Sequence, residues 1–147
     1  MKLTSPVFQP NQPIPSKYTC DGDNINPPLK IADVPGTAKS LALIMDDPDA
    51  PAGNWDHWLV FNIDPQTTEI AENSVPDGVI QGKTDFGDNK YGGPCPGQGQ
   101  HRYFFKLYAL DANLDLKEGA TKAEIEQAMD GHILDQTELV GIYQRQA

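Results

Sequence analysis

The chain has 147 residues, the size of one domain. Eleven Lys and Arg against 21 Asp and Glu give a formal net charge of −10, which argues against nucleic acid and anionic lipid as partners, since both attract basic proteins. Thirteen Gly and thirteen Pro interrupt helices and favour short strands joined by turns. We therefore predict a single, mainly β domain over residues 1–147.

The sequence also suggests where the protein resides. It has no run of about 18 apolar residues, the length that spans a bilayer, and its first residues lack the apolar segment of a secretory signal. We therefore expect a cytoplasmic protein without stable membrane anchoring. Cys20 and Cys95 match neither a disulfide framework nor a zinc motif, so the default expectation in a reducing compartment is two free thiols.

Apolar runs define the predicted strands. Seven prolines in the first 40 residues indicate turns there rather than a helix. The runs at 40–45 and 57–63 are continuous enough to be buried on both faces, and the aromatic run at 102–110 is long enough for a central strand. The predicted strands are 40–45, 57–63, 79–80, 102–110 and 138–145.

One helix is expected near the C-terminus. Thr121-Lys-Ala-Glu124 is a capping box, and Ile125, Ala128 and Met129 follow at helical spacing. Together the segments predict a mainly β fold, an antiparallel β-sandwich of Greek-key type, with one or two short helices near the C-terminus.

Two groups of candidate functional side chains lie where predicted strands end or begin. Asp47 and Asp49 occupy a proline-rich loop after the strand 40–45, where the fixed φ of proline can hold two carboxylates without strand pairing. The alternative is an acidic surface turn. His57 lies among tryptophans, where an imidazole pKa responds to its neighbours, and the alternative is a packed core histidine.

A third group lies between Tyr91 and Tyr103. Four glycines and two prolines there leave backbone amides exposed, as in anion-binding nests. In a strand beginning at His101, the side chains of His101 and Tyr103 point to one face and that of Arg102 to the other. We therefore expect Arg102 to pair with an acidic turn rather than to clamp an anion. An ordinary Gly/Pro loop with a hydrogen-bonded histidine is the alternative.

These groups, with three further stretches, closely resemble the phosphatidylethanolamine-binding protein family in its bacterial Raf kinase inhibitor-like branch. The matching stretches occur in order and cover nearly the whole chain: Tyr18–Gly22, Asn26–Leu29, Lys39–Leu43, Asp46–Pro51, Trp55–Asn62 and Gly93–Leu110. The resemblance implies two antiparallel sheets with a small pocket at one end that binds phosphate, acetate or a phosphoethanolamine head group. The implied lining residues are Asp47, Asp49, Pro51, Trp55, His57, His101 and Tyr103, with Pro94 or Pro96 as a further wall.

Some features depart from the family pattern or leave a question open. The loop Pro94-Cys-Pro-Gly97 has a glycine where bacterial relatives often have a second proline, which affects the expected loop shape rather than the pocket. Cys20 and Cys95 both lie in or beside matching stretches, so a disulfide or redox switch at the pocket rim is the alternative to two thiols. The long C-terminal segment of animal members is missing, so kinase inhibition carries over less readily than anion binding.

The predicted chemistry is binding without catalysis, cofactor or metal. Two carboxylates would repel phosphate unless His57 and His101 supply positive charge, and a carboxylate that accepts a ring N–H would raise the imidazole pKa. The Tyr103 hydroxyl and the loop amides add neutral donors. We expect a small anion or phosphorylated group as ligand, such as phosphate or a phosphoethanolamine-like group.

The expected role is regulatory, of a kinase- or protease-inhibitor-like kind, through a protein partner whose phosphorylated or acidic group docks in the pocket, and apolar end strands suggest a homodimer. One alternative is a protease or kinase inhibitor that acts through surface loops. Another alternative is a hydrolase that uses Cys95 or a water activated by His57 or His101. No serine lies in the three candidate groups, and the histidine spacing matches no metal motif.

Overall fold

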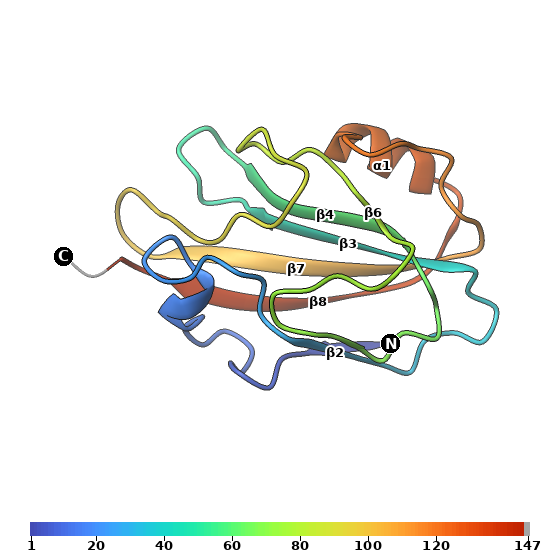
Figure 1. Cartoon of the computed structure of the whole chain (residues 1–147), viewed down its shortest axis with the longest axis horizontal. Helices are drawn as coiled ribbons and strands as arrows, with labels where there is room; N and C mark the ends of the chain where they lie inside the picture. The colour runs from blue at the N-terminus through green and yellow to red at the C-terminus, as the bar shows by residue number, and fades with distance from the viewer. Residues whose placement is uncertain (146–147) are drawn as a thin grey trace.

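Two antiparallel sheets make up the protein, as the computed structural model shows for residues 1–145 (Figure 1). The three-stranded sheet has the order β1-β2-β5, and the five-stranded sheet has the order β6-β4-β3-β7-β8. The strands are β1 Lys2–Thr4, β2 Leu29–Ala32, β3 Ser40–Asp47, β4 Trp55–Ile63, β5 Glu69–Ile70, β6 Ile80–Gln81, β7 His101–Leu110 and β8 Ile133–Tyr143. The prediction of a mainly β, antiparallel architecture is confirmed.

All five predicted strands are present, with shifted ends. β8 differs most, because it begins at Ile133 rather than 138 and ends at Tyr143. Its pairing explains the difference: β8 runs beside the whole of β7, from Leu110 opposite Ile133 to His101 opposite Tyr143. The first half of β8 contains several polar residues, so the search for apolar runs did not identify it as a strand.

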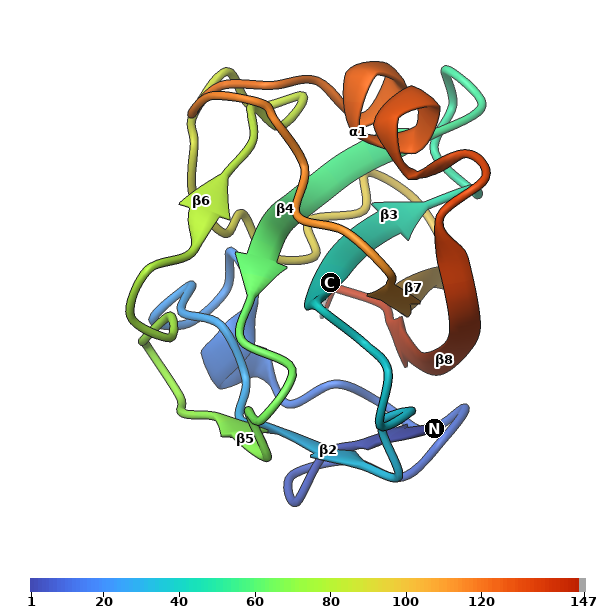
Figure 2. The ribbon, with the colours of Figure 1, turned by 90° about the vertical axis from the view of Figure 1, so that its right-hand side faces the viewer.

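The alternation of side chains in β3 divides the interior into two clusters. Leu41, Leu43 and Met45 point between the two sheets and join the main core. Ala42 and Ile44 point to the other face, where α1 (Lys122–Met129) covers β3 and β4 (Figure 2). Every residue of β3 is buried, as predicted for a strand enclosed on both faces.

This alternation separates two consecutive carboxylates at the end of β3. Asp46 lies on the α1 side, where its Oδ2 accepts hydrogen bonds from Lys106 Nζ at 3.2 Å and Lys122 Nζ at 2.7 Å. Asp47 lies on the opposite side, toward the end of the main core. Asp46 therefore contributes to the α1 side of the sheet and Asp47 to the side of the main core.

The predicted helix is confirmed with its cap. Thr121 accepts a hydrogen bond from the Glu124 amide, and the Glu124 side chain accepts one from the Thr121 amide. Ile125 and Met129 are the buried residues of α1. A second, 3-10 helix, η1 (Ser16–Tyr18), lies near the N-terminus. Within residues 1–145, no helix is long and apolar enough to span a membrane.

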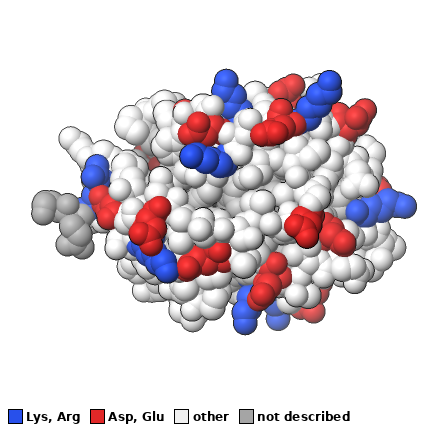
Figure 3. All heavy atoms as spheres, in the orientation of Figure 1, with Lys and Arg blue, Asp and Glu red and all other residues white. Residues whose placement is uncertain are grey.

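Charged side chains are mixed on the face shown in Figure 3. Lys and Arg lie beside Asp and Glu around its margin, and the middle of this face is uncharged. A continuous basic surface, which nucleic acid requires, is not seen on this face, although the lack of a nucleic-acid partner stays a prediction.

Candidate functional site

A pocket of about 310 Å³ lies at the end of the molecule where β3 ends and β4 and β7 begin. The connections 48–54 and 91–100 close it, at the left-hand end of Figure 1. Its polar lining residues come from these strands: Asp47, His57, His101 and Tyr103. The remaining lining residues are Ala50, Pro51, Trp55, Phe86, Cys95, Pro96 and Gly97. Such a volume is at the small end of ligand sites.

Six of the eight predicted residues line this pocket, and two do not. Asp49 is directed to the other side of its loop, where Arg102 binds it. Pro94 is buried behind the wall, with its carbonyl accepting a hydrogen bond from the Cys20 amide at 3.1 Å. Pro96, the other candidate, lines the pocket instead. The ligand-binding role of all these residues stays a prediction.

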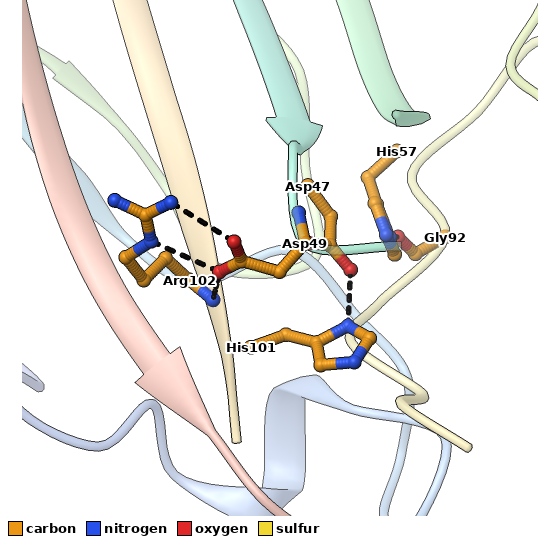
Figure 4. A network of polar contacts seen from close by, with 6 residues as sticks. All are labelled: Asp47, Asp49, His57, Gly92, His101 and Arg102. Atoms are coloured by element: carbon orange, nitrogen blue, oxygen red, sulfur yellow. Dashed lines mark hydrogen bonds and ion pairs between the residues drawn. The ribbon is translucent and has the colours of Figure 1, made fainter. Parts of the chain in front are cut away.

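A hydrogen-bonded pair between β3 and β7, Asp47 and His101, lines the pocket (Figure 4). His101 Nδ1 lies 2.7 Å from Asp47 Oδ2, and both side chains are buried. The other Asp47 oxygen accepts a hydrogen bond from the Asp49 amide at 2.8 Å. Because Asp47 is a carboxylate acceptor, His101 carries its proton on Nδ1, which leaves Nε2 available to a ligand.

His57 is oriented in the same way by a different acceptor. Its Nδ1 lies 2.7 Å from the carbonyl oxygen of Gly92, so this nitrogen is the donor and Nε2 is free. Burial lowers the pKa of His57, and this effect outweighs the opposing influence of the Gly92 carbonyl and of Asp47. Asp47 does act to raise this pKa, as expected of a carboxylate, but the lost hydration of the cation is the larger effect, and the partner of Nδ1 is a carbonyl rather than a carboxylate.

Tyr103 contributes a hydroxyl with no hydrogen-bond partner among the described residues. The side chain is fully buried and its ring meets that of His57 edge-on, with centroids 5.2 Å apart. Burial raises the pKa of Tyr103, and the negative charge of Asp47 adds to this effect. The phenol therefore stays protonated and can donate a hydrogen bond, which a buried hydroxyl normally does.

Arg102 lies on the opposite face of β7, as its position in the strand predicted. Its guanidinium forms a two-pronged pair with Asp49, with Nε–Oδ2 and Nη2–Oδ1 distances of 2.9 Å (Figure 4). The Arg102 amide donates to the same carboxylate at 2.9 Å. These contacts lower the pKa of Asp49 to about 2. Asp49 thus holds the loop in place instead of facing the pocket.

Aromatic rings form one side of the entrance. Phe86 lies edge-on to Trp55 and to His57, with centroids 5.6 and 5.3 Å away. Gly92 allows this approach, because a Cβ at that position would overlap the Phe86 ring. Phe86 was not predicted: it sits in a loop outside the three candidate groups, shortly before Tyr91, and no local pattern marks it.

Cys20 and Cys95 form a disulfide bond, so the default expectation of two thiols is wrong. Both cysteines lie in turn-rich segments 75 residues apart, and only the fold brings them together. In this state Cys95 has no thiol to act as the nucleophile of a hydrolase. Over residues 1–145, no cluster of three or more His, Cys, Asp or Glu side chains is arranged to hold a metal ion.

The chain is similar to known proteins over nearly its whole length. A family model described as phosphatidylethanolamine-binding protein matches residues 4–144. A UPF0098 protein of Methanothermobacter thermautotrophicus is 53% identical over 99% of both chains, and one of Pyrococcus horikoshii is 51% identical over 99% of this chain and 77% of its own.

Two crystal structures share the fold. A phosphatidylethanolamine-binding protein homologue of Chlamydia trachomatis has a TM-score of 0.94 and 45% identity, covering 98% of this chain and 97% of its own. YbcL of Escherichia coli, described as a member of the mammalian family, has a TM-score of 0.92 and 28% identity, covering 99% and 98%. The matching stretches, the fold and the family model agree, and the chain belongs to the phosphatidylethanolamine-binding protein family.

Proposed function

We propose that the pocket binds a small anion or phosphorylated group. One observation carries this proposal: two imidazole Nε2 atoms and the unpartnered Tyr103 hydroxyl belong to side chains that line the same cavity. A buried hydroxyl without a partner costs about 1–3 kcal/mol, and an oxygen-rich ligand would recover this cost. The cavity volume of about 310 Å³ favours a small group over a whole lipid.

The charges in the pocket make binding depend on protons. Among the described residues no lysine or arginine lines it, and Asp47 is a carboxylate, so a fully ionised phosphate would meet repulsion. A neutral His57 presents a bare Nε2, which accepts a hydrogen bond from a protonated ligand oxygen, whereas a protonated His57 donates to an ionised oxygen. Either arrangement brings one additional proton into the complex.

Binding should therefore tighten as the pH falls from 8 to 6. The sign follows from linkage: the anion raises the pKa of an imidazole that burial had lowered, so the complex holds more protons than the free protein. Below the lowered pKa of His57, the free protein is already protonated and the dependence levels off.

The proposal extends to the role of the protein. A binding module of this kind would act without catalysis or cofactor, in the cytoplasm, by receiving a phosphorylated or acidic group of a protein partner such as a kinase or protease. A homodimer built through end strands belongs to the same proposal. Hydrolysis by a histidine-activated water is the competing function, and release of product from a phosphomonoester would distinguish it.

The test is an NMR titration of the imidazole signals with inorganic phosphate and with phosphoethanolamine between pH 5 and 8. We expect saturable shifts of the His57 and His101 imidazole signals, with the lowered pKa of His57 raised in the complex. His132 is the internal control, because it is exposed and bound to Asp111, outside the pocket lining. Equal responses from all three histidines, or none, would refute a specific pocket.

A further inference from the structure

We propose that the Cys20–Cys95 disulfide is a reversible redox switch that controls the affinity of the pocket. The inference rests on the proposed anion-binding function, and it adds a regulatory input to the same site. Cys95 itself lines the pocket, directly before Pro96 and Gly97, which continue the wall. A change at this sulfur is therefore a change in the wall.

The segment before Cys95 is fixed by many contacts. The Tyr91 hydroxyl donates to the Tyr18 carbonyl at 2.7 Å, the Gly92 amide to the His57 carbonyl at 2.9 Å, and the Gly93 amide to Asn24 Oδ1 at 2.8 Å. This part of the chain does not depend on the disulfide for its position.

The segment from Cys95 to Gln100 is held differently. Among the described residues, no hydrogen bond joins residues 95–100 to the rest of the chain. Apart from the packing of the buried Pro96, the disulfide to Cys20 is what fixes this segment before β7 begins at His101. Two glycines, Gly97 and Gly99, make the segment intrinsically flexible, so breaking the disulfide frees it locally.

The disulfide is open to exchange with an external dithiol. Cys95 is exposed and Cys20 is half-buried, so a reductant thiolate reaches Cys95 first. Its attack on Cys95 Sγ forms a mixed disulfide and releases the Cys20 thiolate, which takes up a proton. The second thiol of the reductant then displaces Cys95. Two electrons pass to the protein, and the reductant leaves as a disulfide.

Reduction should weaken anion binding rather than unfold the protein. A freed wall segment must be ordered again for each binding event, and fixing one or two residues corresponds to about a tenfold loss of affinity. Reoxidation restores the wall and the affinity. The oxidised protein thus has the ordered wall and the higher affinity for the anion.

The experiment compares oxidised protein, protein reduced with dithiothreitol, and the double variant Cys20→Ser/Cys95→Ser, with and without dithiothreitol. Inorganic phosphate is the probe, and its dissociation constant is measured by NMR titration. Amide relaxation of Gly97 and Gly99 reports loop order independently of any ligand, with Gly131, in a turn after α1, as the control glycine. We expect a roughly tenfold weaker affinity and a mobile loop after reduction. The variant should match the reduced protein in both buffers.

The outcomes separate the two proposals. If the oxidised and reduced proteins bind phosphate equally, the switch is refuted and the anion pocket stands. If the loop amides do not respond to reduction, or if the whole protein unfolds, the disulfide is only a structural link and the switch is again refuted. If the oxidised protein does not bind phosphate at all, the proposed function fails and the switch fails with it.

Discussion

The Tyr103 hydroxyl is buried without a partner, which makes its removal unusually informative. We predict that Tyr103→Phe leaves the free energy of unfolding unchanged or raises it by about 1 kcal/mol, because an unsatisfied polar group disappears. The same variant should weaken phosphate binding about five- to tenfold through the lost donor. Chemical denaturation and the phosphate titration measure the two effects.

Tyr91→Phe is the matched control. Its hydroxyl is also buried but donates to the Tyr18 carbonyl, so its loss should cost about 1–2 kcal/mol of stability. Parallel destabilisation by both variants would mean that the Tyr103 hydroxyl has a structural partner, and would contradict its assignment to the ligand.

The Asp49–Arg102 pair yields a second prediction. In Arg102→Met, the pKa of Asp49 should rise from about 2 toward 3.8, the ordinary value of an aspartate side chain, as followed by carboxyl-carbon NMR. Because the pKa is lowered in the folded state, the stabilisation is present above pH 3.8 and is lost as the pH falls toward 2. At neutral pH the loss should stay below about 1 kcal/mol, since the pair is largely exposed.

Arg145→Met serves as the control for that experiment. Arg145 pairs with Asp21, whose pKa it helps to lower, so this variant should leave the Asp49 titration unchanged. If both variants shift Asp49 equally, the cause is a general change in charge and not the specific pair.

Strand alternation made much of the site predictable residue by residue. The period of two placed His101 and Tyr103 on one face of β7 and Arg102 on the other, and the structure agrees. It could not decide which way Asp49 points, because a loop after Pro48 has no such period. The structure shows it bound to the arginine on the outer face.

Among the helices and strands, the cap of α1 gives the clearest test of local stability. Thr121→Ala should destabilise the protein by about 1 kcal/mol, because the side-chain acceptor for the Glu124 amide is lost. Thr121→Ser keeps this oxygen and should keep most of the stability. Thermal unfolding measures the difference, and equal melting temperatures for the two variants would contradict the role of the cap.

The strands that were predicted differ physically from those that were not. The long strands β3, β4 and β7 contain apolar runs that predict them, because most of their residues are buried in the core. The resemblance implied a second sheet, but the strands of the three-stranded sheet were not located, because they have two to four residues and give no apolar run. Such short strands form through pairing with distant partners, such as Leu3 with Ile31 and Leu29 with Ile70, which no local pattern contains.

For the whole molecule, the disulfide is the largest single constraint on the unfolded chain. It joins residues 75 apart, and its removal in Cys20→Ser/Cys95→Ser should cost about 2–4 kcal/mol. We expect a melting temperature lower by about 10 °C and a protein that remains folded at 25 °C, as followed by circular dichroism. A variant that is unfolded at 25 °C would contradict this expectation.

The contacts that escaped prediction are also those of the whole molecule. Phe86 reaches the pocket only because the tertiary fold brings separate loops together. The pairing of Cys20 with Cys95 depends on the fold in the same way, and the sequence offered it only as the alternative to two thiols. The lack of a signal-like segment led us to expect a reducing compartment, in which two thiols are the default. In the folded chain the two cysteines lie close enough to form a disulfide.

The placement of Asp46 and Asp47 on opposite faces of β3 has a consequence for insertions and deletions. Adding or removing a single residue inside β3 would exchange their environments, placing one carboxylate against the core and depriving two lysines of the other. Each inserted or deleted residue would misplace both Asp46 and Asp47, so β3 does not tolerate changes in length. In the turn that follows, Asp49 is anchored to Arg102 and Pro51 lines the pocket, so changes in length are better tolerated at its exposed tip, Ala52 and Gly53.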